Sequence, residues 1–199
     1  TFYTMDTVVT LTLPESDANA TRKSLEALSQ QLNCYADQGA LAALNASGTS
    51  QDADLRDVIS QTILLEDRFG TGVQLSSGAL SRLWGITSEH PRVPTDADRL
   101  AALETLGDDR IRLDRSGITL PADMQLDLGA VAKGYALDQT AQQWQDAGIA
   151  WGILSLRSSV LLYGSKPGGE DFTVQIQDPN GTGILGTVTT PASVSYTHL

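Results

Sequence analysis

The stretch LDLGAVAKGYALD, residues 126–138, contains the residues whose types and spacing are best suited to chemistry. It places Asp127 and Lys133 in an otherwise apolar run, where a strand-like pattern changes to a helical one. Free backbone N–H groups at a helix start bind anions such as phosphate, whereas the helix dipole disfavours a cation there. Lys133 is therefore explained if a pyrophosphate lies between its ammonium group and the helix amides. The alternative, that Lys133 is a solvated surface residue beside turn glycines, fits the spacing equally well.

The charge of the chain limits the ligands that it can hold. Its 13 basic and 24 acidic residues give a net charge of −11, which argues against nucleic acid as a partner because a backbone reader needs a positive surface. An anionic ligand would instead need helix amides, a specific lysine or a bound cation. One cysteine, Cys34, and two histidines exclude a metal site built on these residue types. A bound metal would therefore be a hard cation with oxygen ligands.

The periodicity of the apolar residues predicts an α+β fold with a mostly antiparallel sheet and flanking helices, because strands and helices occur in blocks. Helices are predicted over residues 19–35, 53–68, 95–107 and 134–147, with a short one ending near Trp84. Strands are predicted over residues 7–13, 124–128 and 151–164, and hairpins around residues 114–117 and 178–181. A chain of 199 residues is long enough for one substantial domain, so we expect a single domain over residues 1–199.

Several segments together resemble one known family. LDLGAVAKGYALD, followed by a predicted helix and an apolar strand, resembles the Lys-Gly-Tyr segment of the ApbE family of FAD:protein FMN transferases. TMDTVVTLTL, LSQQLNCYADQGALAALN, GTGVQLSSGALSRLWGI and VQIQDPNG resemble further segments of this family, in the family's order. The resemblance covers roughly residues 3–193 and implies an ApbE- and T-fold-like architecture.

The resemblance implies an activity. Members of the family bind FAD as substrate and, with Mg²⁺, attach FMN through a phosphoester to a threonine of a target flavoprotein, releasing AMP. It therefore implies an acceptor flavoprotein as partner. It also implies an extracytoplasmic location, with the protein held at the cell membrane as a lipoprotein. Because the numbered chain opens on a predicted strand, we expect that an export segment preceded Thr1.

The resemblance also implies site residues where this sequence matches the family. Lys133 corresponds to the lysine beside the pyrophosphate and is the expected catalytic residue, and the main-chain carbonyl of Ala130 corresponds to a Mg²⁺ ligand. The residues expected to contact FAD are Met5, Tyr35, Gly72, Val73, Gln74, Asp127 and Lys133. By residue type alone, Met5 and Tyr35 would more often be core residues.

Two positions depart from the family pattern. Gln74 stands where the family has an aspartate; it can still hydrogen-bond a flavin edge but carries no charge. Arg157 and Ser158 stand where members have a pair of glycines, which permit close backbone approach. Arg157 therefore either intrudes on the pocket or supplies a new cation, and we favour the first interpretation.

The family pattern continues past the end of this sequence, with a histidine before an Asp-Pro pair and an aspartate and threonine that bind the metal. We therefore expect a C-terminally truncated transferase domain, with residues 196–199 foreign to the family, and a poor catalyst. His198 is too close to the preceding segments to match the family histidine. Two alternatives stay open: an FAD-binding or FAD-scavenging module without transferase activity, and an α+β protein without a ligand.

Overall fold

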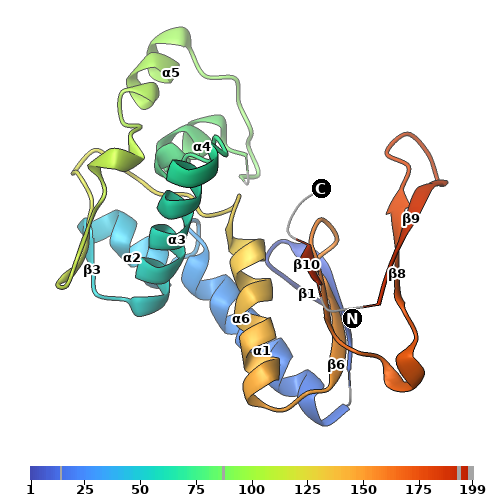
Figure 1. The fold of residues 1–199 in the computed structure, drawn as a ribbon. Helices are drawn as coiled ribbons and strands as arrows, with labels where there is room; N and C mark the ends of the chain where they lie inside the picture. Colours follow the sequence, from blue (N-terminus) through green and yellow to red (C-terminus); the bar gives the residue numbers. More distant parts are fainter. Residues whose placement is uncertain (14, 87, 192–193, 197–199) are drawn as a thin grey trace. The chain divides into compact units, whose positions relative to one another are not determined.

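The computed structural model describes residues 1–13, 15–86, 88–191 and 194–196 (Figure 1). Its helices are α1 (Glu15–Leu32), α2 (Ala40–Ser47), α3 (Ala53–Phe69), α4 (Gly78–Trp84), α5 (Asp96–Leu103) and α6 (Ala132–Asp146). Its strands are β1 (Phe2–Thr4), β2 (Thr7–Thr12), β3 (Thr49–Ser50), β4 (Arg112–Asp114), β5 (Gly117–Thr119), β6 (Trp151–Ser155), β7 (Val160–Gly164), β8 (Phe172–Gln177), β9 (Ile184–Thr190) and β10 (Val194–Tyr196). The described strand pairs are all antiparallel, so the predicted α+β class is confirmed.

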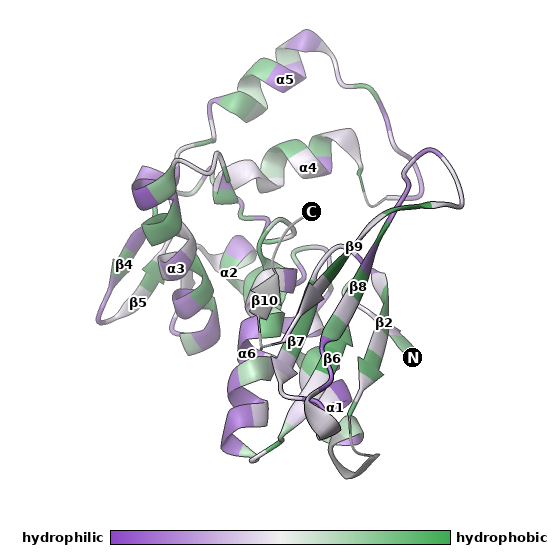
Figure 2. Cartoon of the chain, turned by 45° about the vertical axis from the view of Figure 1, so that its right-hand side comes forward, coloured by the Kyte–Doolittle hydropathy of each residue, from purple (hydrophilic) through white to green (hydrophobic). Residues whose placement is uncertain are grey.

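Helix α3 shows how local sequence produces these elements. Asp52 precedes it, and the carboxylate of Asp52 accepts a hydrogen bond from the Leu55 N–H at 2.9 Å, which caps the first turn. Gly70 follows it with a φ of 59° and ends the helix in the left-handed conformation that favours glycine. Hydrophilic and hydrophobic residues alternate along the helix (Figure 2), and the buried ones form one face.

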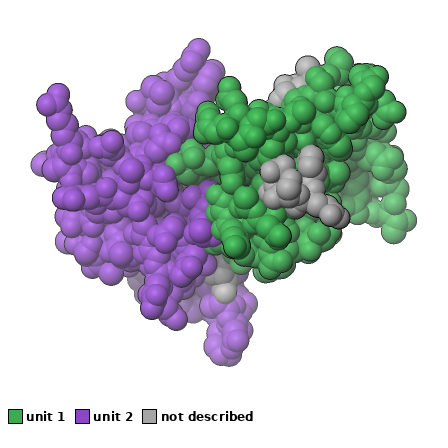
Figure 3. Space-filling view, turned by 90° about the horizontal axis from the view of Figure 1, so that it is seen from below, with its two compact units in different colours: residues 1–26, 133–199 green, residues 27–132 purple. Residues whose placement is uncertain are grey.

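The chain forms two compact units (Figure 3). Unit 1 contains residues 1–26 and 133–199, and unit 2 contains residues 27–132. Helix α1 therefore begins in unit 1 and ends in unit 2, and α6 begins at the junction between them.

Unit 1 is built on a five-stranded sheet with the order β1-β2-β6-β7-β10. Trp144 of α6 is completely buried, and its indole N–H donates to the Thr21 hydroxyl of α1 at 2.9 Å. The Trp144 ring also forms a T-shaped pair with Tyr163 on β7, with 5.6 Å between ring centroids. A Cβ on Gly152 of β6 would lie 2.6 Å from this ring, so the glycine makes room for the tryptophan. These contacts hold α1 and α6 against the sheet.

Met5 and Asp6 form the two-residue turn between β1 and β2. Their φ angles are 52° and 54°, which is the pattern of a type I′ hairpin turn, and Thr4 pairs with Thr7 across it. Methionine rarely adopts this conformation, because a Cβ is strained at positive φ. The turn thus holds Met5, a predicted FAD contact, in a conformation that its own residue type does not favour.

The prediction of one buried strand over residues 151–164 is wrong. The segment forms two strands, β6 and β7, joined by a tight turn at Leu156–Ser159. Arg157 has a φ of 65°, and the Ser158 N–H donates to the Leu156 carbonyl at 2.9 Å, which is the pattern of the strained form of the γ-turn. The glycine pair of the family is thus replaced by a residue held in the left-handed region.

We expect Arg157→Gly to stabilise the protein by about 0.5–1 kcal/mol. Relief of the left-handed strain is worth about 1–2 kcal/mol, and the extra chain entropy of glycine offsets roughly 0.5–1 kcal/mol of it. Urea unfolding measures the change. Arg157→Ala is the control, because it removes the guanidinium and keeps the positive φ. A lower midpoint for Arg157→Gly than for Arg157→Ala would show that the turn is unstrained, because only the extra chain entropy of glycine would then remain.

Unit 2 contains α2 to α5 and the three-stranded sheet β3-β5-β4. The strand predicted over residues 124–128 is wrong, because this segment pairs with none of the described strands. Met124, Leu126 and Leu128 are buried as the alternating pattern predicts. The backbone is extended, but its partners are a side chain and a helical segment rather than a neighbouring strand.

Candidate functional site

Segment 124–128 is held on two sides within unit 2. From α2, the Asn45 amide donates to the Leu126 carbonyl at 2.9 Å and accepts from the Leu126 N–H at 2.8 Å. From the other side, the Gly78 N–H donates to the Gln125 carbonyl at 3.0 Å. A Cβ on Gly78 would lie 2.7 Å from this same carbonyl oxygen, so only glycine permits the approach. The backbone on either side of Leu126 is therefore tightly positioned.

This arrangement positions Asp127, which is a predicted FAD contact. Its N–H donates to the Leu75 carbonyl at 2.8 Å, which sets it beside the segment that carries Gln74. Its Oδ1 accepts from the Gly129 N–H at 2.8 Å, and its Oδ2 lies 3.4 Å from the Tyr35 hydroxyl, which donates to it. The structure thus brings three predicted site positions together in unit 2: residues 35, 74 and 127.

Tyr35 lies just past the end of α1, which stops at Leu32, so the helix predicted over residues 19–35 is too long at this end. The guanidinium of Arg82 covers the Tyr35 ring at 5.3 Å and also donates to the Cys34 carbonyl. Burial, with a smaller effect of the Asp127 charge, raises the pKa of the Cys34 thiol to about 11. Cys34 is therefore a neutral thiol at physiological pH, and the charges in this neighbourhood are those of Arg82 and Asp127.

The segment over residues 72–74 leads into the short 3₁₀ turn η1 (Leu75–Ser77). Gly72 has a φ of 74°, and its N–H donates to the Glu66 carboxylate at 2.9 Å. Gln74 is exposed, and its amide group lies 2.7 Å from Asp108 and 2.9 Å from the Ser76 hydroxyl. Val73 is half-buried. The side chain of Gln74 is therefore ordered by neighbours of its own unit.

The remaining predicted site residues are Ala130, Lys133 and Met5. Ala130 is exposed in the turn before α6, at the end of unit 2. Lys133 is half-buried in the first turn of α6, and Met5 lies in the β1–β2 turn; both belong to unit 1. Within the described ranges, the Lys133 ammonium group makes no hydrogen bond or ion pair. A half-buried lysine without such a partner is suited to an external anion.

The described residues do not form a closed metal site. Among them, no group of three or more histidine, cysteine, aspartate or glutamate side chains is placed to hold an ion. Among the described residues, the Ala130 carbonyl is the metal ligand that the sequence predicts. A single carbonyl does not define a metal centre. His198 lies outside the described residues.

Three residues of this site were not singled out from the sequence: Asn45, Arg82 and Asp108. Each acts across a long separation in the chain, such as the 81 residues between Asn45 and Leu126. Asn45 carried a weak signal, because a polar residue at the end of the apolar helix α2 is out of place on a buried face. Arg82 and Asp108 carried no local signal.

These elements and contacts define an α+β protein with antiparallel sheets, in which the Asp127 carboxylate meets the Tyr35 hydroxyl and the Asp127 N–H meets the segment that follows Gln74. The chain belongs to the ApbE family, whose profile matches residues 5–196. This confirms the resemblance on which the site residues were predicted. In the described part of the chain, no helix is both long enough and apolar enough to cross a membrane.

Relatives with assigned names support the family. The chain is 29% identical over 195 residues to the FAD:protein FMN transferase of Treponema pallidum (strain Nichols), which covers 85% of this chain and 54% of that protein. It is 29% identical over 204 residues to the FAD:protein FMN transferase of Rhodobacter capsulatus, which covers 94% of this chain and 39% of that protein. The chain thus spans about half the length of the curated relatives that it matches.

Solved structures share the fold. The ApbE protein of Thermotoga maritima superposes with a TM-score of 0.87 at 20% identity, over 96% of this chain and 66% of that one. The apo form of the flavinyl transferase ApbE of Pseudomonas stutzeri gives a TM-score of 0.79 at 21% identity, over 92% of this chain and 64% of that one.

Proposed function

We propose that this chain belongs to an FAD:protein FMN transferase, which attaches FMN through a phosphoester to a threonine of an acceptor flavoprotein and releases AMP. The observation that carries the proposal is the Asp127 carboxylate. It is fixed by the Gly129 N–H and the Tyr35 hydroxyl, next to the 72–75 segment. An oriented, half-buried carboxylate of this kind is suited to accept hydrogen bonds from a nucleotide, and the named relatives support FAD as that nucleotide.

Cleavage of a pyrophosphate requires charge neutralisation on its non-bridging oxygens. With a net charge of −11, this chain repels such an anion, so local groups must supply the attraction. We propose that Lys133 contacts the pyrophosphate and that the reaction depends on Mg²⁺. The Ala130 carbonyl is the predicted protein ligand of the ion in this chain, and the ion would neutralise charge on the phosphate oxygens.

We also propose an extracytoplasmic location and attachment to the cell membrane as a lipoprotein. The support for both is the family resemblance alone. Vesicle flotation and subcellular fractionation of the protein in its native cells would test them.

Lys133→Ala is expected to weaken FAD binding about tenfold, because it removes a cation with no described partner of its own. Lys166→Ala is the matched control. Lys166 is also half-buried in unit 1, but its ammonium group donates to the Asp171 carbonyl at 2.9 Å and lies 5.2 Å from the Phe172 ring centroid. Flavin fluorescence titrations with Mg²⁺ measure both affinities. Equal losses in the two variants would remove Lys133 from the site.

A second candidate is an FAD-binding or FAD-scavenging module without transferase activity. The neutral Gln74 in place of an aspartate favours it, as does Arg157 in place of a family glycine. The transferase and the binding module are distinguished by incubating the chain with FAD, Mg²⁺ and an acceptor protein and measuring the released AMP by chromatography. AMP formed in step with protein-bound FMN supports the transferase, and binding of FAD without AMP release supports the module.

A further inference from the structure

The side-chain amide of Gln74 has acceptors for both of its hydrogens. Its Nε2 atom donates to Asp108 Oδ1 at 2.7 Å and to Ser76 Oγ at 2.9 Å. An ionised carboxylate only accepts hydrogen bonds, so the group that faces Asp108 must be the NH₂ end of the amide. The orientation of the Gln74 amide therefore follows from the chemistry of its partner.

Asp108 is held in turn by the backbone that it contacts. Its Oδ2 accepts from the Leu75 N–H at 2.7 Å, and its Oδ1 accepts from the Ser76 N–H at 2.8 Å. Together with Gln74, three donors surround this carboxylate. Asp108 is thus an anchor for the segment over residues 74–76 rather than a group available to a ligand.

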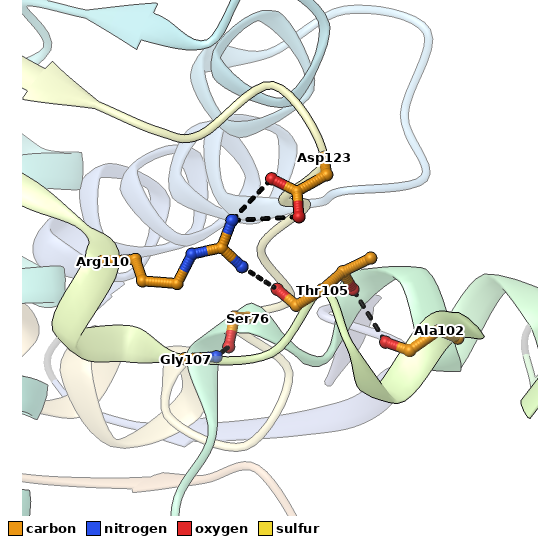
Figure 4. A network of polar contacts seen from close by, with 6 residues as sticks. All are labelled: Ser76, Ala102, Thr105, Gly107, Arg110 and Asp123. Carbon is orange, nitrogen blue, oxygen red and sulfur yellow. Dashed lines mark hydrogen bonds and ion pairs between the residues drawn. The ribbon is translucent and has the colours of Figure 1, made fainter. Parts of the chain in front are cut away.

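The loop that carries Asp108 is fixed on both sides, as Figure 4 shows. The Gly107 N–H donates to the buried Ser76 hydroxyl at 2.9 Å. Arg110 donates to both carboxylate oxygens of Asp123, at 2.7 and 2.9 Å. Gly107 itself has a φ of 135°, which favours glycine. The position of the carboxylate is therefore built into the fold of unit 2.

We propose that Asp108 and Ser76 are positioning residues that occupy the amide hydrogens of Gln74 and leave its carbonyl oxygen, Oε1, as the group offered to bound FAD. Gln74 is exposed, and Oε1 has no hydrogen-bond partner among the described residues. A carbonyl oxygen selects an N–H donor, so Gln74 reads either the imide N–H of the flavin or the exocyclic amine of the adenine. This inference rests on the proposed function, because it needs FAD as the ligand.

Two FAD analogues distinguish the donors. In 3-methyl-FAD a methyl group replaces the imide hydrogen, and in flavin hypoxanthine dinucleotide a carbonyl replaces the exocyclic amine. We expect the unaltered chain to bind one of them roughly tenfold more weakly than FAD in a fluorescence titration, because one hydrogen bond is lost. The analogue that binds weakly identifies the donor.

Variants then test the role of each residue. Gln74→Ala should bind FAD and the weak analogue equally, because the acceptor is gone. Asp108→Asn should reduce the difference in affinity between FAD and the weak analogue. An asparagine amide cannot accept from three donors as the carboxylate does, so the Gln74 amide becomes free to rotate. The matched controls are Gln61→Ala and Asp57→Asn. This exposed pair on α3 has the same amide-to-carboxylate contact at 2.9 Å, and both variants should keep full discrimination.

If Asp108→Asn weakened the binding of FAD and of the weak analogue by the same factor, Asp108 would have only a structural role and the inference would be wrong. The NMR spectrum of the unaltered protein without ligand gives an independent test, since both Gln74 amide hydrogens should exchange slowly with water. Rapid exchange of both, equal binding of all three nucleotides, or full discrimination in Gln74→Ala would each overturn the inference while FAD binding stands. No binding of FAD at all would contradict the proposed function itself, and this inference with it.

Discussion

Gly78→Ala is expected to destabilise the protein by about 1–3 kcal/mol and to weaken FAD binding at the same time. Gly78 has a φ of −57°, so the change introduces no backbone strain of its own. The added Cβ would lie 2.7 Å from the Gln125 carbonyl oxygen and 2.9 Å from the Leu126 carbonyl oxygen, and both are backbone atoms that no rotamer change can move away. The segment that places Asp127 must shift to accept it.

Urea unfolding and an FAD titration measure the two effects of Gly78→Ala. Gly186→Ala is the control, because no heavy atom lies within 4 Å of its added Cβ, and we expect its stability to change by no more than about 0.5 kcal/mol. Similar unfolding midpoints for the two variants would show that the approach of Gly78 to Gln125 is not close in solution.

Asp127→Asn is expected to weaken FAD binding roughly 10–100-fold, the range for hydrogen bonds to a charged group. The fold should persist, because the asparagine oxygen can still accept from the Gly129 N–H as Oδ1 of Asp127 does at 2.8 Å. The charge and the second acceptor, which lies 3.4 Å from the Tyr35 hydroxyl, are lost. Calorimetric titration measures the affinity, and thermal melting checks the fold.

Asp114→Asn is a matched control for Asp127→Asn. Asp114 also accepts a hydrogen bond from the N–H two residues later, at 2.7 Å from Ser116, but it lies in the β4–β5 hairpin. The Asp114→Asn variant should bind FAD with the affinity of the unaltered chain. Wild-type affinity in Asp127→Asn, with an unchanged melting temperature, would contradict the assigned contact.

Much of the fold was predictable because its signals are local. Asp52 and Gly70 mark the two ends of α3, and Thr95 accepts a hydrogen bond from the Asp98 N–H to cap α5, as its sequence indicates. The prediction for α5 extended to Gly107, whereas the helix ends at Leu103. The capping residue thus located the start of α5, whereas no local pattern located its end.

The errors arose where distant contacts decide the structure. Segment 124–128 has the alternation of a strand, but Asn45 lies 81 residues away and supplies the hydrogen bonds that a neighbouring strand would. The turn at Arg157 has none of the glycine or asparagine that marks a residue with positive φ. No local pattern could relate Asp108 to Leu75, 33 residues away.

The candidate site was predictable in its residue types and order but not in its supporting contacts. Tyr35, Gln74 and Asp127 were named from the family pattern, and the structure brings Tyr35 and Asp127 within 3.4 Å of each other. What holds them lies in backbone groups, such as the Leu75 carbonyl that accepts from the Asp127 N–H. Such groups are independent of side-chain identity, so residue types do not reveal them.

The most direct test of FAD binding at this site is a titration of the unaltered chain with FAD, FMN and AMP, with and without Mg²⁺, followed by flavin fluorescence and calorimetry. We expect saturable binding of one FAD per chain. FAD should bind more tightly than FMN or AMP, because only FAD offers both halves of the nucleotide and the pyrophosphate. An unchanged flavin signal and no heat of binding, in both the presence and the absence of Mg²⁺, would contradict the claim that the chain binds FAD.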